Sequence, residues 1–354
     1  MSIREIRDKT TWDDFITAQK DHTFLHSWAW GKLNEAEGDK IWHLGFYDDN
    51  RLVVVALVIK VHARRGNFLF VPQGPIFDKN WANPKSEYRN TKQIQNHKFQ
   101  ILDKLTNHLK QLAQEEGGVA FIRISPLLEE SEENKKMFRD LGFRNAPIYM
   151  HAETAWQLDI TKNEDELMMG MRKNTRNLVR RAQKDGVEIF SGVNDEFIEE
   201  FFKLYKQTAG KHGFTPFSKN YIKEEIKAFE GSAKIYLAKY KGKTLSTAVI
   251  VQQGTGAFYH HGASSPDDTK IPAAYLLQWQ AILDAKQNGR TRYNFWGIAK
   301  NEDDKKHPWH GLTFFKKGFG GYRTDYMHAQ DLPLSPKYWL NYLIEKVRLL
   351  KRGV

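Results

Sequence analysis

Hydrophobic and polar positions along the chain trace one set of elements twice. Alternating apolar residues, a short polar turn and a β-branched run predict a β-hairpin at 43–60, and the same pattern returns at 235–253. In both copies the hairpin is followed by another strand and then by a helix with apolar residues at helical spacing. These elements are expected at 68–77 and 99–117 in the first copy and at 256–264 and 273–289 in the second. The pattern therefore predicts a duplicated unit.

The duplication continues beyond the helices. A buried-looking strand comes next in both copies, at 119–126 and 292–298, and a segment with a Gly-Phe step follows, at 138–145 and 314–321. A hairpin followed by a helix and a central strand is typical of a mixed, antiparallel-rich sheet and not of a doubly wound parallel one. We therefore predict an α/β (α+β) fold of two tandem GNAT-like acyltransferase domains.

The boundary between the two predicted domains falls near residue 150. We expect domain 1 at 1–150 and domain 2 at 151–334. The segment 335–352 has the pattern of an amphipathic helix, which we expect to pack on domain 1. The alternative is a helix that lies on a membrane surface. The basic residues that support this alternative are Arg348, Lys351 and Arg352.

Composition narrows the class of protein. A chain of 354 residues with 40% hydrophobic residues is typical of globular packing in more than one domain. It has no cysteine, which excludes disulfides, thiolate metal ligands and a cysteine nucleophile and suits a reducing compartment. The first residues, MSIREIRDKTTWDDF, lack the apolar core of a signal peptide, and no apolar run reaches membrane-spanning length. We therefore expect a cytoplasmic protein.

The charge balance points to anionic partners. The formal net charge of +11 attracts nucleic acid, phosphorylated metabolites or an anionic membrane surface, and does not choose among them. No zinc-finger, RNA-recognition or helix-turn-helix signature is present in the sequence, so DNA is not an expected partner.

A single helix is predicted over 164–186, with acidic residues first, basic residues later and a glycine at its end. Its basic residues at intervals of four form one stripe: Arg172, Arg176, Arg180 and Lys184. A basic stripe is often only a solvated face. Here carboxylates are missing one turn before Arg176 and Arg180, and planar guanidinium groups suit phosphate oxygens, so we predict phosphate recognition.

The segment GLTFFKKGFGG at 311–321 carries the candidate chemistry. Two lysines, Lys316 and Lys317, lie between phenylalanines and a glycine run. Taken alone, the segment favours a surface strand or helix start whose lysines are solvated. An ammonium enclosed by apolar side chains would instead have an altered pKa, which is how enzymes prepare a lysine for chemistry.

Eight segments, in order, resemble the Fem-type peptidoglycan-bridge aminoacyltransferases, the FemA, FemB and FemX group. The resemblance covers nearly the whole chain. The segments are SWAWGKLNEAEG at 27–38, FVPQGPIFD at 70–78, FIRISP at 121–126, RKNTRNLVRRAQKDGV at 172–187, FYHHGASS at 258–265, YLLQWQAI at 275–282, YNFWGI at 293–298 and GLTFFKKGFGG at 311–321.

This resemblance implies an aminoacyltransferase. Members of the family transfer an amino acid from aminoacyl-tRNA to an amine on the stem peptide of a UDP-linked or lipid-linked muramyl-pentapeptide, in the cell-wall synthesis that maintains cell shape. It implies aminoacyl-tRNA as co-substrate and no further cofactor. The short link between 221–233 and the second hairpin leaves no room for the helical arm of some members, so the chain is similar to the compact branch. We expect a monomer, and peripheral contact with the inner face of the membrane stays open.

The resemblance also implies site residues. Lys316 of the Phe315-Lys316 pair would lie at the reaction centre, and Arg176, with Arg180 on the same stripe, would hold precursor phosphates. The family usually has a lysine at the register of Asn34, and Lys32 is the nearby substitute.

Three further positions depart from the family pattern. Ser125 and Asn294 stand where the family commonly has aspartate, and His261 stands where tyrosine is usual. These departures bear on which substrate is used and not on the fold.

The chemistry can be argued from the residues themselves. Aminoacyl-tRNA carries an activated ester, so attack by an amine requires no nucleophile from the enzyme. It requires a positive charge where the tetrahedral oxyanion develops. Lys316, enclosed by Phe315 and Phe319, is the candidate for that charge, and Lys317 is expected to face the tRNA backbone.

Two aromatic residues, Tyr259 and Trp296, fit the wall of a peptide channel and fit a hydrophobic core equally well. The candidates for a general base are Asp78, His260 and His261, although a histidine is more often structural than catalytic.

No metal site is predicted from the sequence. His307 and His310 have the right spacing for two ligands, but no carboxylate pattern completes the set.

Two other functions stay open. One is a GNAT-type N-acyltransferase that uses acyl-CoA, although neither 264–277 nor 41–76 has the glycine-rich loop that cradles a pyrophosphate. The other is a non-catalytic relative that binds RNA or an anionic surface, which the altered residues Asn34, Ser125 and Asn294 favour.

Overall fold

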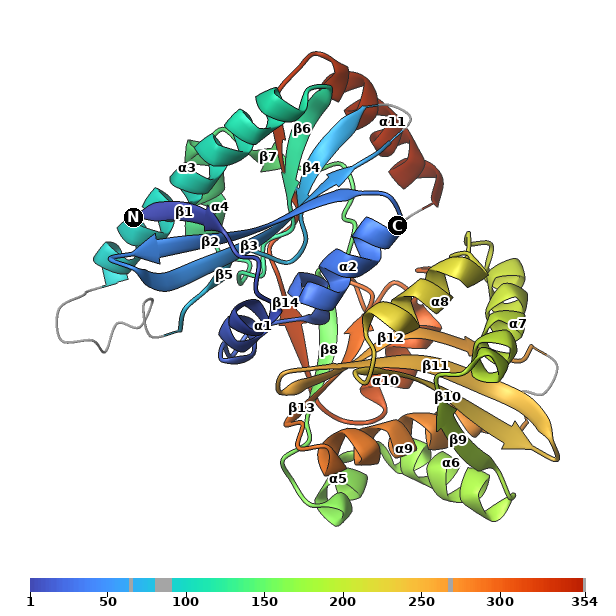
Figure 1. Cartoon of the computed structure of the whole chain (residues 1–354). Helices are drawn as coiled ribbons and strands as arrows, with labels where there is room; N and C mark the ends of the chain where they lie inside the picture. Colours follow the sequence, from blue (N-terminus) through green and yellow to red (C-terminus); the bar gives the residue numbers. More distant parts are fainter. Residues whose placement is uncertain (64–65, 80–90, 267–269, 353–354) are drawn as a thin grey trace. The chain divides into compact units, whose positions relative to one another are not determined.

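The computed structural model describes residues 1–63, 66–79, 91–266 and 270–352. In the 264–277 segment, whose sequence lacks a glycine-rich pyrophosphate loop, residues 267–269 lie outside the described residues. The chain divides into two compact units (Figure 1). Unit 1 contains Met1–Glu153 and Asp325–Val354, and unit 2 contains Thr154–Thr324.

The second boundary lies at residue 324 rather than at the predicted 334. The physical reason is strand β15 (Gln330–Pro333), which pairs antiparallel with β6 (Val119–Ile124) and so returns the chain to unit 1 before the last helix.

Unit 1 is built on a mixed sheet with the strand order β1-β2-β3-β4-β6-β15-β7, in which β5 also pairs with β3. Its other strands are β1 (Ser2–Glu5), β2 (Lys40–Asp48), β3 (Arg51–Val61), β4 (Asn67–Val71), β5 (Ile76–Phe77) and β7 (Arg144–Asn145). Its helices are α1 (Lys9–Thr17), the 3-10 helix η1 (Phe24–His26), α2 (Trp28–Ala36), α3 (Thr91–Glu116), α4 (Glu132–Asp140) and α11 (Lys337–Arg352).

Side-chain alternation along these strands creates two cores. Leu69 and Ile122 join the core under α3 and α4, whereas Phe68 and Phe121 face the other way and pack with Tyr338 of α11. Both faces of the sheet are therefore covered.

Unit 2 is built on a second mixed sheet, with the strand order β14-β8-β13-β12-β11-β10-β9. The strands are β8 (Thr154–Asp159), β9 (Glu188–Gly192), β10 (Ala233–Tyr240), β11 (Lys243–Gln253), β12 (Gly256–Ser264), β13 (Arg292–Gly297) and β14 (Tyr322–Asp325). The helices are α5 (Glu164–Gly170), α6 (Lys173–Lys184), α7 (Asp195–His212), α8 (Lys219–Ala228), α9 (Ala273–Gln287) and α10 (His310–Lys317).

The predicted duplication is confirmed. Strands β2 and β3 form one hairpin and β10 and β11 the other, and each hairpin turns through two residues with positive φ, Asp49 and Asn50 or Lys241 and Gly242. This turn matches the twist of paired strands. In both copies the next strand is antiparallel to the hairpin, and the strand after the helix is parallel to it: β4 with β6 and β12 with β13.

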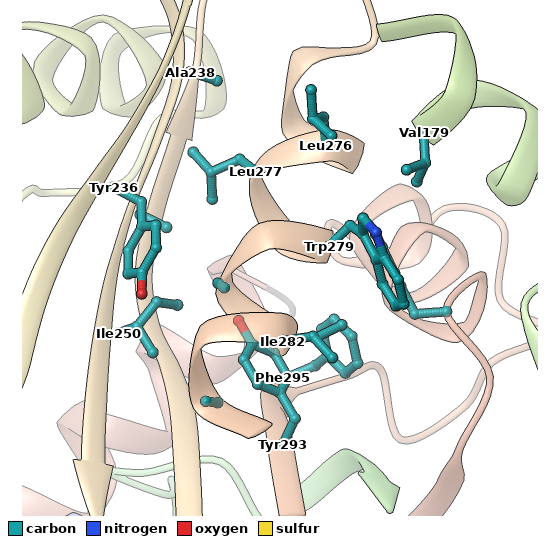
Figure 2. Packing of buried hydrophobic residues seen from close by; sticks show 14 of the residues in the cluster. Val179, Tyr236, Ala238, Ile250, Leu276, Leu277, Trp279, Ile282, Tyr293 and Phe295 are labelled. Carbon is teal, nitrogen blue, oxygen red and sulfur yellow. The ribbon is translucent and has the colours of Figure 1, made fainter. Parts of the chain in front are cut away.

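Helix α9 is largely buried because it is enclosed on two sides. Figure 2 shows Trp279 of α9 and Val179 of α6 on one side, and Tyr236 and Ile250 of the sheet on the other. A helix in this position exposes little apolar surface, and polar residues such as Gln280 and Gln287 keep to the side that reaches solvent.

Helix α11 is held to unit 1 by a buried charge cluster. The Arg123 guanidinium donates to Asp331 at 2.7 Å and to Glu345 of α11 at 2.8 Å. Arg123 and Asp331 are almost completely buried, so each charge depends on its partners for solvation.

We expect Arg123→Met to lower the free energy of unfolding by about 3–5 kcal/mol, because it leaves two buried carboxylates without their cation. Urea unfolding measures the change. Arg139→Met, which removes an exposed arginine 3.7 Å from Glu132, is the matched control and should cost under about 1 kcal/mol. Equal effects of the two substitutions would contradict this role for Arg123.

Candidate active site

The parallel ladder between β12 and β13 stops early. It joins 256–258 to 292–294 and no further. In β12, Tyr259 pairs with Ile250 and His261 with Val249, so His260 is an extra residue that bulges from the strand. In β13, Trp296 has a φ of +66°, and its N–H donates to the side chain of Asn294 at 2.8 Å.

A bulky residue with positive φ is strained and is typical of functional sites. The bulge and the strained tryptophan together separate the two strands beyond residue 258.

Lys316, near the end of α10, extends its side chain to these separated strands. It is 4% exposed, and its Nζ donates to the Gly297 carbonyl at 2.6 Å and lies 5.7 Å from the ring centre of Tyr259. Burial lowers the pKa of Lys316 to about 7, against an ordinary value of 10.5. Lys316 is therefore a buried amine that is partly charged at neutral pH.

The glycine run after Lys316 fixes the end of α10. The Gly318 carbonyl accepts from the Arg172 N–H at 2.9 Å, and the Gly320 carbonyl accepts from Trp156 Nε1 at 2.6 Å. Gly321 has a φ of +100°, and a Cβ there would lie 2.1 Å from the Gln157 carbonyl oxygen. Only glycine fits so close to β8.

The phenylalanines next to Lys316 pack elsewhere than predicted. Phe315 and Phe319 contact each other and both contact Tyr275 of α9, with Phe315 half-buried. The aromatic side chain that lies beside the Lys316 Nζ is Tyr259. Positions 315 and 319 therefore anchor the helix, which leaves the intervening lysine to point towards β12 and β13.

Lys317 has a protein partner. Its Nζ pairs with the Glu302 carboxylate, which also accepts a hydrogen bond from Arg323 at 3.2 Å. The Lys317 Nζ also lies 5.3 Å from the ring centre of Trp156. Its contact with tRNA stays a prediction, and it now competes with this pair.

The predicted helix over 164–186 is wrong as a single helix. Asn163 and Glu166 form a capping box at the start of α5, which ends at Gly170. Met171 is extended, and α6 begins at Lys173. Sequence periodicity cannot reveal this break, because both helices have amphipathic patterns.

Two arginines of the predicted stripe, Arg172 and Arg176, are engaged within the protein, and Arg180 has no such contact in the described part of the chain. Arg176 donates from Nη1 to the carbonyls of Met168, Met169 and Met171 at 3.1–3.4 Å, so it caps the end of α5. Arg180 is exposed and has no ion-pair partner within the described residues. Arg181, on the same helix, pairs with Asp185 at 3.4 Å.

Arg172 leaves the stripe and contributes to a cavity. It donates to the Phe314 carbonyl at 2.9 Å, with its guanidinium 4.0 Å from the centre of that ring. The cavity of about 350 Å³ is lined by Arg172, Glu302, His310, Thr313, Phe314 and Lys317. Sequence reasoning missed it, because its lining comes from three distant segments.

A second cavity of about 550 Å³ lies at the start of α9. Its basic residues are Arg181 and Lys270, and its polar residues Ser264 and Ser265 follow from the end of β12. These cations and the positive end of the α9 dipole make it suited to an anion, although the Ala273 and Tyr275 N–H groups already donate to the Ile271 and Pro272 carbonyls.

The bulge at His260 also assembles a buried polar cluster. His260 Nδ1 and His261 Nε2 lie 2.5 and 3.1 Å from the two carboxylate oxygens of Glu225 on α8. Burial disfavours the charged carboxylate, but the two imidazoles outweigh that effect and hold the pKa of Glu225 below its usual value. The three ligand atoms lie within 4.8 Å of one another, and this donor set is one that zinc accepts.

Neighbouring histidines on a regular strand point to opposite faces, so sequence reasoning did not find this cluster. The pair it did consider, His307 and His310, does not combine with a carboxylate within the described residues.

The remaining predicted residues lie as follows. Tyr259 is partly exposed and packs against the core of unit 2, and Trp296 lies 6.2 Å from His260, ring centre to ring centre. Lys32 is in unit 1, exposed, and pairs with Glu35 at 2.7 Å. Asp78, also in unit 1, pairs with Arg51. Unit 2 thus brings Lys316 and Tyr259 together, whereas the Trp296 ring contacts Phe258 and His260.

Comparison with known proteins identifies the family. The sequence model of the FemAB family matches residues 8–244 and 239–346. The chain belongs to the FemAB family.

Two relatives are similar to this FemAB-family chain. It is 29% identical to the UDP-N-acetylmuramoylpentapeptide-lysine N(6)-alanyltransferase of Weissella viridescens over 216 residues, 58% of this chain and 63% of that protein. It is 24% identical to the lipid II:glycine glycyltransferase of Staphylococcus epidermidis over 321 residues, 70% of this chain and 76% of that protein. The match therefore spans less than two thirds of the Weissella protein.

Solved structures confirm the predicted fold class. The crystal structure of FemX covers 98% of this chain and 100% of its own, with a TM-score of 0.80 at 19% identity. A tandem GNAT protein from the clavulanic acid biosynthesis pathway covers 95% of this chain and 99% of its own, with a TM-score of 0.54 at 11% identity. The fold is thus GNAT-like and used twice.

We expect Gly321→Ala to lower the free energy of unfolding by about 3 kcal/mol or more, because the methyl group meets the Gln157 carbonyl in a backbone conformation that alanine disfavours. Gly311→Ala is the control, since a Cβ there meets no atom within 4 Å and should be neutral or stabilising by about 0.5 kcal/mol. Chemical denaturation measures the free energy of unfolding of both variants. A Gly321→Ala variant no less stable than Gly311→Ala would refute the steric argument.

We expect Lys316→Met to raise the free energy of unfolding at pH 7 by about 2–3 kcal/mol, because burying the ammonium costs more than its hydrogen bond returns. Lys317→Met, which loses only a part-exposed ion pair, should change it by under about 1 kcal/mol.

The same group predicts a pH dependence of stability. Between about pH 7 and 10.5 the unfolded chain holds a proton that folded Lys316 has released, so stability rises with pH in this window. Unfolding measured across it should show the rise in the wild type and a smaller rise in Lys316→Met. Parallel curves would mean that Lys316 is solvated.

Proposed function

We propose that this chain transfers an amino acid from aminoacyl-tRNA to an amine on the stem peptide of a muramyl-pentapeptide precursor, forming part of a peptidoglycan interpeptide bridge. Membership of the FemAB family and the names of both relatives support the reaction class and the acceptor. The observation that carries the proposal is the buried Lys316 at the end of the β12–β13 ladder.

In the proposed reaction, the acceptor nitrogen attacks the ester carbonyl of aminoacyl-tRNA. An amide bond forms, the ester bond to the ribose breaks, and the proton lost by the amine is balanced by the one gained by the ribose oxygen. Lys316 donates a hydrogen bond to the oxyanion that develops between these events. Its desolvation strengthens that interaction, since a charge in a low dielectric acts more strongly than one in water.

The anionic parts of both substrates need cations. Arg172 in the smaller cavity and Lys270 in the larger one are suited to phosphate groups of the precursor or the tRNA. Lys317 and Arg181 would join them by exchanging their carboxylate partners, Glu302 and Asp185, for phosphate. We propose Arg180 as a further phosphate contact, because it is exposed and unpaired within the described part of α6. Arg176 supports this surface indirectly, by joining α5 to α6.

A cytoplasmic site of action is proposed with this activity, since aminoacyl-tRNA is a cytoplasmic compound. The described residues contain no helix long and apolar enough to cross a bilayer.

The larger cavity favours a second candidate function, acyl transfer from acyl-CoA. It lies at the start of α9, where a helix N-terminus and two basic residues would equally suit a pyrophosphate. Replacing aminoacyl-tRNA by acetyl-CoA in the same assay separates the two donors.

We expect the purified chain to move label from aminoacyl-tRNA to a UDP-linked muramyl-pentapeptide, and Lys316→Met to reduce the rate at least about 100-fold. The matched control is Lys234→Met, which changes an exposed lysine of β10 and should retain the rate. Folding of each variant is checked by its unfolding curve. No transfer to UDP-linked and lipid-linked acceptors, or equal rates of the two variants, would refute the proposal.

A further inference from the structure

Helix α11 exposes several large apolar side chains, whereas it buries two polar side chains together with Tyr338. Asn341 and Glu345 are buried towards unit 1, where Glu345 binds Arg123. The exposed side carries large apolar residues, with exposed fractions of 50% for Trp339, 59% for Leu340, 61% for Leu343, 42% for Val347 and 84% for Leu350. A helix on a solvated protein surface normally has the opposite arrangement.

These apolar residues form one continuous stripe. Residues three and four apart on a helix are neighbours, which links Leu340 to Leu343, Leu343 to Val347 and Val347 to Leu350. We define the α11 stripe as Trp339, Leu340, Leu343, Val347 and Leu350. Contiguous apolar surface of this kind is typical of an interaction site.

Basic residues border the α11 stripe on both sides. Lys346 lies beside Leu343, at an offset of three, and Lys351 lies beside Val347, at an offset of four. Lys337 and Arg348 are exposed on the same helix. Glu345 is the one acidic residue of α11, and it is buried, so the exposed charges described on this helix are all positive.

The positive rim extends onto the sheet. Arg144 of β7 lies with its guanidinium 4.6 Å from the ring centre of Trp339 and 4.8 Å from that of Tyr342. Trp339 therefore contacts a cation at one edge of the α11 stripe. Tryptophan is common at membrane interfaces, where one end of its ring system is wet and the other is in contact with lipid.

The charge pattern selects among occupants. In a symmetric contact with a second copy, the all-basic rims would face each other and repel. An anionic phospholipid surface instead offers an apolar layer for the stripe and phosphates for the rim. The net charge of +11 adds long-range attraction to the same surface.

We propose that α11 docks this protein on a bilayer that contains anionic phospholipid, with the α11 stripe at the boundary between headgroups and acyl chains. The helix lies in the plane of the interface and does not span the bilayer. In combination with the proposed function, on which this consequence rests, docking would concentrate the protein where a lipid-linked acceptor is held.

The test is co-sedimentation of the full chain with phosphatidylcholine vesicles, with and without phosphatidylglycerol. We expect binding to the anionic vesicles that weakens as salt rises. Leu343→Glu should weaken it at least about tenfold, because a carboxylate replaces an inserted apolar group. Val193→Glu, at an apolar residue of unit 2 that is 50% exposed, is the matched control and should bind as the wild type does.

Charge reversal tests the rim separately. Lys346→Glu and Lys351→Glu should each weaken vesicle binding about fivefold. Because these residues and Leu343 are exposed, their variants should unfold as the wild type does, which denaturation verifies. No vesicle binding, or equal binding by Leu343→Glu and Val193→Glu, would overturn the proposal. So would a concentration-dependent dimer that Leu343→Glu dissociates, since a second copy would then cover the stripe.

The outcome is independent of the transfer reaction. Leu343→Glu should retain transfer to the UDP-linked acceptor, because Leu343 lies outside the candidate active site. Vesicle binding without any transfer would refute the proposed function and leave the docking proposal standing. Transfer without vesicle binding would refute the docking proposal and leave the proposed function standing.

Discussion

The removal of one ammonium from water is the constraint on which unit 2 is organised. Lys316 has lost almost all contact with solvent and keeps a single described acceptor, the Gly297 carbonyl. That carbonyl is available because Trp296 takes a strained conformation and ends the parallel ladder. The glycines that follow Lys316 then hold α10 against β8 at distances that no other residue permits. Strain and desolvation are thus concentrated in one place, as is typical of a site built for chemistry.

The same fold is used twice with different chemistry at the corresponding place. In unit 1 the parallel ladder of β4 and β6 ends at Val71 and Ile124. Gln73, with a φ of +42°, and Ser125 follow directly, and their side-chain oxygens are buried without a hydrogen-bond partner within the described residues. Unit 1 therefore has buried neutral polar groups at the end of its parallel ladder, where unit 2 has a buried amine.

The basic residues fall into two groups, those paired inside the protein and those that line cavities or lie on an exposed surface. Some cations are consumed within the protein, as Arg123 is in unit 1 and Arg176 at the end of α5. Others line the two cavities of unit 2 or border the α11 stripe. A sum over the sequence counts both kinds alike, whereas only the second kind can attract a polyanion. The net charge of the chain is consequently a weaker guide to partners than the position of each cation.

The sequence by itself determined the elements and their duplication, because hairpin turns, helical spacing and β-branched runs act over a few residues. The resemblance of eight ordered segments to a known family, and not the apolar neighbours alone, pointed to Lys316. Only the tertiary structure decided that 164–186 breaks into two helices, that Arg176 caps α5, that Lys317 meets Glu302, and that His260 and His261 share a face. It also decided which side of α11 faces outward. Each of these depends on a partner distant in sequence or on a bulge set by strand register, and no local pattern encodes either.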